Sequence, residues 1–189
     1  MLERQSGNDA LTGIRPAAVD PGEVFAGPDP FPVRLPVVAL VASAGGVDAL
    51  SRVLGLLPMG LPAAVLVALH QSPGQPSRLA PILARRTHLP VEVATDRTML
   101  RPGHVLIVPP AHHLLVTSEA RIGLISTGSL PPARPSADLL LATLAVTCGS
   151  RALAVILTGL GHDGQAGVRA VARCGGPVLA QVKSERRTT

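Results

Sequence analysis

Three residues of this chain carry the side chains that acyl transfer needs, and each lies at or shortly after the end of an apolar run. Ser43 directly follows one such run, His70 directly follows a second, and Asp163 comes a few residues after a third. A serine that attacks, a histidine that takes its proton and a carboxylate that orients the histidine form the catalytic triad of serine hydrolases. The sequence therefore predicts Ser43, His70 and Asp163 as catalytic residues, if the fold brings them together.

Each of these residues also has an ordinary structural role open to it. Ser43 could cap the helix that follows, and Gly45 and Gly46 could hold a phosphate at the same helix N-terminus. His70 could be a hydrogen-bonded loop histidine, and Asp163 could cap its own helix. A nucleotide site is disfavoured because neither a G-x-G-x-x-G fingerprint nor a Walker lysine is present. The position of all three residues near strand ends is what favours a triad.

Apolar runs that alternate with helical spacing must position these residues. The alternation predicts an α/β fold of three layers, with a doubly wound, mainly parallel, Rossmann-like sheet and helices on both faces. Ligands of such sheets bind beyond the carboxyl ends of the strands, where the three residues would meet. The expected strands are 37–42, 63–69, 91–94, 105–108, 113–117, 122–126, 153–157 and 177–180, and the expected helices are 47–57, 76–86, 136–147 and 163–173.

The composition fits one domain with a core of aliphatic side chains. The 189 residues are 47% hydrophobic and include two Phe but no Trp or Tyr, which suits parallel strands covered by helices. The net charge of +5 fits an acidic protein partner. The arginines are scattered and stacking aromatics are missing, so nucleic-acid binding is disfavoured. Neither a signal-peptide core nor a membrane-length apolar run is visible, so we expect a cytoplasmic protein without membrane insertion.

No metal site or disulfide framework is expected from the cysteines and histidines. Cys148 and Cys174 have neither the number nor the spacing for such sites, and both are expected as small buried side chains. His112 and His113 are neighbours on an expected strand, where adjacent side chains point to opposite faces. We expect a Pro/Gly-rich flexible leader over residues 1–35, one domain over residues 36–181 and a charged tail over residues 182–189.

Five segments carry recognisable motifs. In chain order they are Val41–Val47, Leu69–Pro73, Leu100–Pro110, Arg134–Leu140 and Val155–Gly167. Together they resemble the catalytic domain of the chemotaxis-receptor methylesterase family, the CheB type. The first resembles the family's G-A-S-T/A-G-G motif, and the second its Q-H-M-P segment. The third is similar to L-x-P-G-x-x-Y-I-A-P, the fourth to R-P-S-V-D-x-L, and the fifth to V-I-L-T-G-M-G-x-D-G-x-x-G. The five segments occur in the family's order.

The resemblance implies hydrolysis of glutamate methyl esters on the cytoplasmic helices of chemoreceptors, with deamidation of glutamines as a further activity of many members. It implies Ser43 as the nucleophile, His70 as the base and Asp163 as the carboxylate behind it, with no cofactor and no metal. The backbone N–H of Ala44 is the expected oxyanion donor. Gly45, Gly46 and Leu160 complete the expected lining of the site.

Four departures from the family's pattern set further expectations. No receiver domain precedes the first strand, so control by phosphorylation is not expected. Ala44 stands where Thr is common, and Leu160 and His162 replace Met and Asn in the aspartate loop. The sequence stops before the family's G-M-P-x-x-A motif, so we expect a C-terminally short domain with apolar surface left uncovered. Such a surface favours a homodimer.

Two other functions remain open at this point. The chain could be a catalytically weak or silent relative that binds a receptor or signalling partner. It could also keep the serine chemistry and act on a different acyl substrate, because nothing in the sequence names the receptor.

Overall fold

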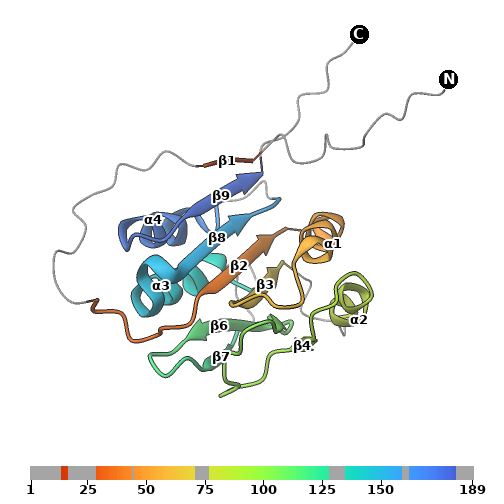
Figure 1. Cartoon of the computed structure of the whole chain (residues 1–189), viewed down its shortest axis with the longest axis horizontal. Coiled ribbons are helices and arrows are strands. Elements are labelled where there is room, and N and C mark those ends of the chain that lie inside the picture. The colour runs from red at the N-terminus through yellow and green to blue at the C-terminus, as the bar shows by residue number, and fades with distance from the viewer. Residues whose placement is uncertain are drawn as a thin grey trace, which may run out of the picture.

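The computed structural model describes residues 14–16, 29–43, 45–70, 77–127, 135–158 and 162–181. They form three layers, with a central sheet, two helices on one face and two on the other (Figure 1). The strands are β1 (Ile14–Pro16), β2 (Val37–Ala42), β3 (Ala64–Leu69), β4 (Val91–Val93), β5 (Val105–Ile107), β6 (His112–Val116), β7 (Ile122–Ser126), β8 (Ala152–Ile156) and β9 (Val178–Gln181). The α-helices are α1 (Val47–Leu56), α2 (Leu79–Ala84), α3 (Ala137–Cys148) and α4 (Gln165–Arg173), and a short 3-10 turn over Gly149–Arg151 joins α3 to β8.

The central sheet has the strand order β1-β9-β8-β2-β3-β5-β4. All of its strand pairs are parallel except β1, which pairs antiparallel with β9. Strands β6 and β7 form a separate antiparallel pair. The expected doubly wound, mainly parallel α/β fold is confirmed, and the order places β2 between β3 and β8. The strands that lead to Ser43, to His70 and toward Asp163 are therefore neighbours.

Burial on both faces explains why these strands are almost wholly apolar. All six residues of β3 are buried, as are five of the six in β2. Side chains alternate between the faces of a strand, so Ala39 and Val41 pack with α3 while Leu40 and Ala42 pack with α1 and α2. A strand with an apolar residue on each face is what a sheet between two helix layers requires.

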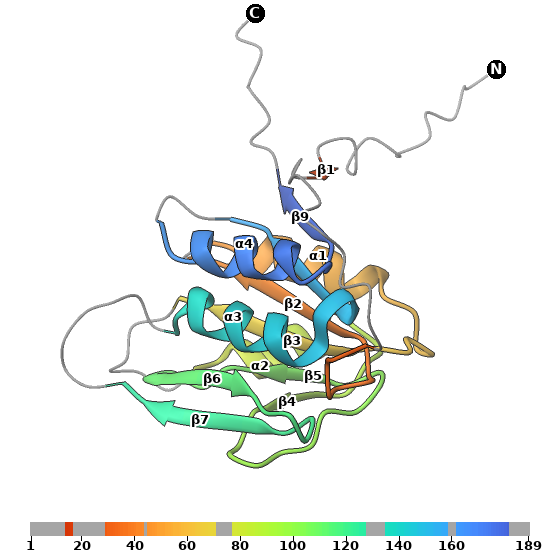
Figure 2. The ribbon, with the colours of Figure 1, turned by 90° about the vertical axis from the view of Figure 1, so that its left-hand side faces the viewer.

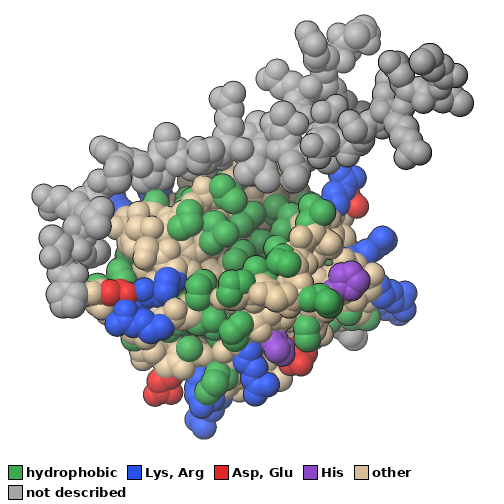
Figure 3. All heavy atoms as spheres, in the orientation of Figure 1, with side chains coloured by type: hydrophobic (Ala, Val, Ile, Leu, Met, Phe, Trp, Pro, Cys, Tyr) green, Lys and Arg blue, Asp and Glu red, His purple; other side chains and the backbone are tan. Residues whose placement is uncertain are grey.

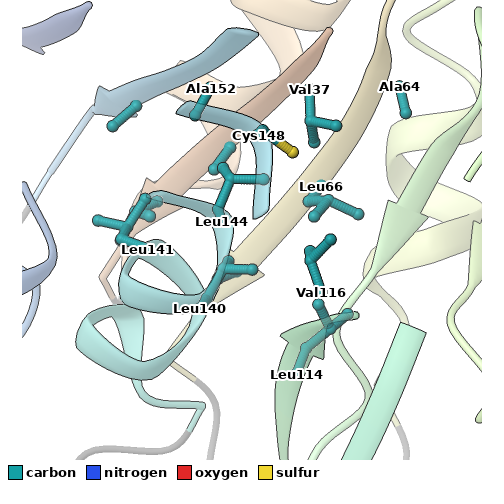
Figure 4. Packing of buried hydrophobic residues seen from close by; sticks show 14 of the residues in the cluster. Val37, Ala64, Leu66, Leu114, Val116, Leu140, Leu141, Leu144, Cys148 and Ala152 are labelled. Carbon is teal, nitrogen blue, oxygen red and sulfur yellow. The ribbon is translucent and has the colours of Figure 1, made fainter. Parts of the chain in front are cut away.

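Helix α3 lies on one face of the central sheet, between α4 and the β6–β7 hairpin (Figure 2). Leu140 and Leu144 of α3 are fully buried and face the region between Leu66 of β3 and Val116 of β6 (Figure 4). Because α3 is covered from several sides, its position is closely constrained by packing.

The segment before β2 differs from the expected flexible leader, because residues 29–36 lie against the domain. Val33 is 1% exposed, and its N–H donates to the carbonyl of Thr147 at 3.0 Å. Asp29 forms an ion pair with Arg151, whose Nε donates to the Val33 carbonyl at 2.8 Å. These contacts are made one residue at a time and leave no periodic pattern in the sequence.

The surface of the described residues combines scattered cations with exposed apolar side chains. In the view of Figure 3, apolar side chains gather in the middle of the face and basic side chains lie toward its margins. Leu56, Met59 and Val146 are the most exposed of the large apolar residues. No helix among the described residues is long and apolar enough to cross a bilayer.

The burial of Val33 gives a test of whether residues 29–36 belong to the folded domain. Val33→Ala should lower the free energy of unfolding by about 1–3 kcal/mol, because it removes buried methyl groups and leaves a cavity. Urea unfolding measures this, with Val93→Ala as the control because Val93 is 44% exposed. Equal stability of the Val33 variant and the wild type would contradict the packing described.

Candidate active site

Ser43 lies directly after β2, and its backbone is fixed by the segment that follows β8. Its N–H donates to the carbonyl and to the hydroxyl of Thr158, each at 3.1 Å. Helix α1 begins only after Gly46, which is its N-cap residue and makes no side-chain capping bond. Ser43 is therefore not the N-cap of α1, and its capping role can be set aside. Thr158 was not among the expected site residues.

The two glycines after Ser43 are required by backbone geometry. Gly45 has a φ of 90°, which disfavours any residue with a side chain. A Cβ on Gly46 would lie 2.5 Å from the Cβ of Ala42 and 2.7 Å from the hydroxyl of Thr158. The N–H of Gly46 donates to the Ser43 carbonyl at 2.9 Å, so it is not available as an oxyanion donor. Ala44 and Leu160 lie outside the described residues.

His70 follows β3 at the same edge of the sheet. Strands β2 and β3 pair in register, with Ala42 opposite Leu69, and the N–H of His70 donates to the Ala42 carbonyl at 3.2 Å. This pairing places Ser43 and His70 next to each other across adjacent strands. Both residues line the same pocket.

Asp163 is held by the N-terminus of α3 rather than by its own helix. Its carboxylate accepts hydrogen bonds from the backbone N–H groups of Ala137 at 2.7 Å and Asp138 at 3.1 Å, and from the Ser136 hydroxyl at 3.2 Å. Helix α4 has Gly164 as its N-cap and no side-chain capping bond. The alternative that Asp163 caps α4 is therefore excluded.

The Oδ2 atom of Asp163 also lies 2.9 Å from Nε2 of His70. Burial raises the pKa of Asp163, but the bonds from His70 and from the amides of Ala137 and Asp138 oppose this, and the net effect is a lowered pKa. An ionised carboxylate can only accept, so His70 must donate through Nε2. Its Nδ1 then carries the lone pair that can accept a proton.

The three expected triad residues line one pocket of about 350 Å³ at the carboxyl ends of the strands. Its other walls are mainly aliphatic, with Ile156 of β8, Val168 of α4 and Val178 of β9. Gln165 and Arg169 of α4 add polar groups. An apolar pocket with a few convergent polar groups is the usual form of a small-ligand site.

Three residues that sequence reasoning did not assign to the site help to hold Asp163 in place. They are Ser136, Asp138 and His113. Ser136 donates to Asp163 and also accepts from the N–H of Leu139 as the N-cap of α3. The backbone N–H of Ser136 donates to Nδ1 of His113 at 3.0 Å. Asp138 accepts from the N–H of Gly167 at 2.7 Å and so ties α3 to α4. The sequence around residue 136 signalled a helix start, but not what that start would bind.

Several of the remaining histidines have hydrogen-bond partners. Nδ1 of His112 lies 2.8 Å from the carbonyl of Pro110. Over the described part of the chain, no group of three His, Cys, Asp or Glu residues could hold a metal ion. Cys148 is buried and Cys174 is half-buried, and burial raises the pKa of both thiols. A thiol with a raised pKa is a weak nucleophile at neutral pH.

Comparison with known proteins connects this geometry to one family. The family model described as CheB methylesterase matches residues 38–188. The chain is 39% identical over 150 residues to the protein-glutamate methylesterase FrzG of Myxococcus xanthus, covering 79% of this chain and 45% of that protein. It is 40% identical over 153 residues to a protein-glutamate methylesterase/protein-glutamine glutaminase of Geobacter sulfurreducens, covering 79% and 41%. The chain thus spans less than half the length of these curated relatives.

A solved structure has the same fold. The crystal structure of the CheB methylesterase catalytic domain of Thermotoga maritima superposes with a TM-score of 0.72 at 33% sequence identity. The match covers 77% of this chain and 79% of that one.

The lowered pKa of Asp163 predicts a pH-dependent contribution to stability. A carboxyl group whose pKa is lower in the folded state than its ordinary 3.8 stabilises the fold above that value. This contribution is lost as the pH falls through the folded-state pKa. Asp163→Asn should therefore be less stable than the wild type near neutral pH, and the difference should shrink below about pH 4.

Urea unfolding at several pH values between about 3 and 7 measures this difference. Asp48→Asn is the matched control, because the Asp48 side chain is 78% exposed. A difference for Asp163→Asn that stays constant over this range would contradict the electrostatic origin of the effect.

Proposed function

The chain belongs to the CheB methylesterase family, and we propose that it hydrolyses glutamate methyl esters on chemoreceptors through Ser43, His70 and Asp163. The observation that carries this proposal is the 2.9 Å contact between His70 and Asp163 in the pocket that Ser43 also lines. A nucleophile, a base and an orienting carboxylate in one pocket are what acyl transfer requires.

The proposed reaction has two steps. Oγ of Ser43 attacks the ester carbonyl carbon while Nδ1 of His70 takes the hydroxyl proton. The C–O bond to the methoxy group then breaks, and the same proton leaves with it as methanol. A water molecule, deprotonated by His70, hydrolyses the acyl-enzyme and releases the glutamate carboxylate and the serine.

Asp163 serves this cycle by keeping its charge and its position. His70 becomes positively charged when it takes the proton from Ser43, and an ionised carboxylate at 2.9 Å stabilises that charge. The amides at the start of α3 favour the ionised form of Asp163. The fixed carboxylate also holds the imidazole so that Nδ1 remains the nitrogen available to the serine.

The aliphatic walls of the pocket suit the side chain of an esterified glutamate. Ile156, Val168 and Val178 can contact its methylene groups, whereas a free carboxylate would lose hydration there. Deamidation of glutamine uses the same geometry, with ammonia leaving in place of methanol. The printed names of several relatives include protein-glutamine glutaminase as well as methylesterase, which favours this second activity.

The proposal also includes a cellular location and an oligomeric state. Chemoreceptor helices that carry such glutamates lie in the cytoplasm, so we place the activity there. A homodimer is part of the proposal because apolar side chains such as Leu56 and Met59 are exposed. The alternative of a silent binding module is disfavoured, because the half-buried carboxylate of Asp163 contacts His70 in the same pocket that Ser43 lines, and binding alone does not require these three groups together.

The first prediction of this proposal concerns the nucleophile. Ser43→Ala should reduce methanol release from a methylated receptor by about 10⁴-fold or more, as removal of a triad serine does. Ser51→Ala is the control, because the Ser51 hydroxyl donates to the Val47 carbonyl of its own helix and lies outside the pocket residues. Retention of most of the activity by the Ser43 variant would show that another residue attacks the ester.

The second prediction concerns the coupling of His70 and Asp163. His70→Gln and Asp163→Asn should each abolish most turnover, and the double variant should be little worse than the worse single variant. Residues that act as a unit are not additive, so a double-mutant cycle on kcat measures the coupling. Losses that multiply would mean that Asp163 acts independently of His70.

A further inference from the structure

One wall of the active-site pocket carries a cation, Arg169, that the proposed reaction does not use. Gln165 and Arg169, both on α4, line the pocket together with Ser43, His70 and Asp163. Helix α4 begins beside Asp163 and lies next to α3 on the same face of the sheet, toward its β9 edge (Figure 2). The side chains on its exposed face are therefore the first that a protein substrate approaching along this wall would meet.

The arginines of α4 form a continuous strip. Gln165, Arg169 and Arg173 are spaced four residues apart, which places them on the same face of the helix. All three are exposed, and α4 itself contains no acidic residue. The strip therefore leads from the pocket along the helix with one sign of charge. We call Arg169 and Arg173 the α4 arginine pair.

Among the described residues, the α4 arginine pair has no carboxylate at ion-pair distance, as is also true of Arg85 and Arg86, whereas other arginines of the domain do. Arg52, Arg121 and Arg151 each lie within 4.0 Å of a carboxylate. Neither Arg169 nor Arg173 has such an ion pair within the described residues. The nearby carboxylates are engaged elsewhere, since Asp163 binds His70 and α3, and Asp138 accepts from Gly167.

We propose that the α4 arginine pair docks an acidic helix of the protein substrate and so guides its esterified side chain into the pocket. The guanidinium group matches a carboxylate through two parallel hydrogen bonds. Four residues of α-helix advance about 6 Å, so carboxylates at positions i and i+4 of a substrate helix have the same repeat as the arginine pair. This inference rests on the proposed function and names the feature of the substrate that α4 recognises.

Charges at the rim of a site act mainly on association. Complementary charges there raise the association rate and make binding sensitive to salt, whereas they contribute little to the chemical step. The α4 arginine pair should therefore favour an acidic helical substrate over a small neutral ester. The effect should appear in kcat/KM and in Kd more than in kcat.

The test uses direct binding, so that it does not require turnover. A fluorescein-labelled helical peptide with unesterified glutamates at i and i+4 is titrated with the full chain and followed by fluorescence anisotropy. R169E/R173E should weaken this binding about tenfold or more, and added salt should reduce the difference from the wild type. R169K/R173K keeps the charge and should retain most of the binding.

R85E/R86E is the matched control. Arg85 and Arg86 follow α2, on the opposite side of the sheet from α4, and they are also exposed adjacent cations without an ion pair among the described residues. This control should bind within about twofold of the wild type. R169Q/R173Q removes the two charges without adding acidic ones, and its weaker binding would support the proposal even if R169E/R173E does not fold.

Two outcomes would overturn the inference. Unchanged binding by both R169E/R173E and R169Q/R173Q would do so, and so would an equal loss in R85E/R86E, because the effect would then be one of net charge. Failure of the proposed function looks different. A wild-type chain that binds the acidic peptide through Arg169 and Arg173 but releases no methanol from its methyl ester would contradict the esterase while supporting the docking surface.

Discussion

The carboxylate of Asp163 at the N-terminus of α3 is the contact on which the rest of the site depends. A buried helix start exposes backbone N–H groups that must find acceptors. Asp163 satisfies those of Ala137 and Asp138, and it is kept ionised by doing so. The same carboxylate fixes the imidazole of His70. One side chain therefore caps the start of α3 and fixes the imidazole that we propose as the base.

The sheet supplies the second constraint, because strand order decides which residues meet. Strand β2 lies between β3 and β8, so the segments after these three strands emerge side by side. Thr158, just after β8, binds the backbone of Ser43, and Ala42 accepts from His70. Because Gly46 has no side chain, the segments after β2 and β8 can lie in close contact there. The site is thus built on backbone pairing, which gives it a rigid base.

Helix α4 connects the chemistry to the surface that a substrate would meet. Its start is next to Asp163, and the bond from Gly167 to Asp138 fixes it against α3. Val168 and Arg169 then present an aliphatic and a cationic group to the same pocket. An esterified glutamate on an acidic helix combines these properties, since its side chain is apolar while its surroundings are charged. Pocket and rim would therefore contact different parts of the proposed substrate.

The sequence by itself determined the elements and the residues that we propose for the chemistry. Apolar runs and helical spacing are local patterns, so strands such as β2 and helices such as α3 could be predicted close to their observed bounds, as could the positions of Ser43 and His70 at strand ends. Only the tertiary structure decided that Asp163 binds α3 instead of capping α4, and that His70 faces it through Nε2. His70 and Asp163 are 93 residues apart in the chain. Contacts of that range, like the packing of Val33 on Thr147, depend on how elements assemble and leave no local signal.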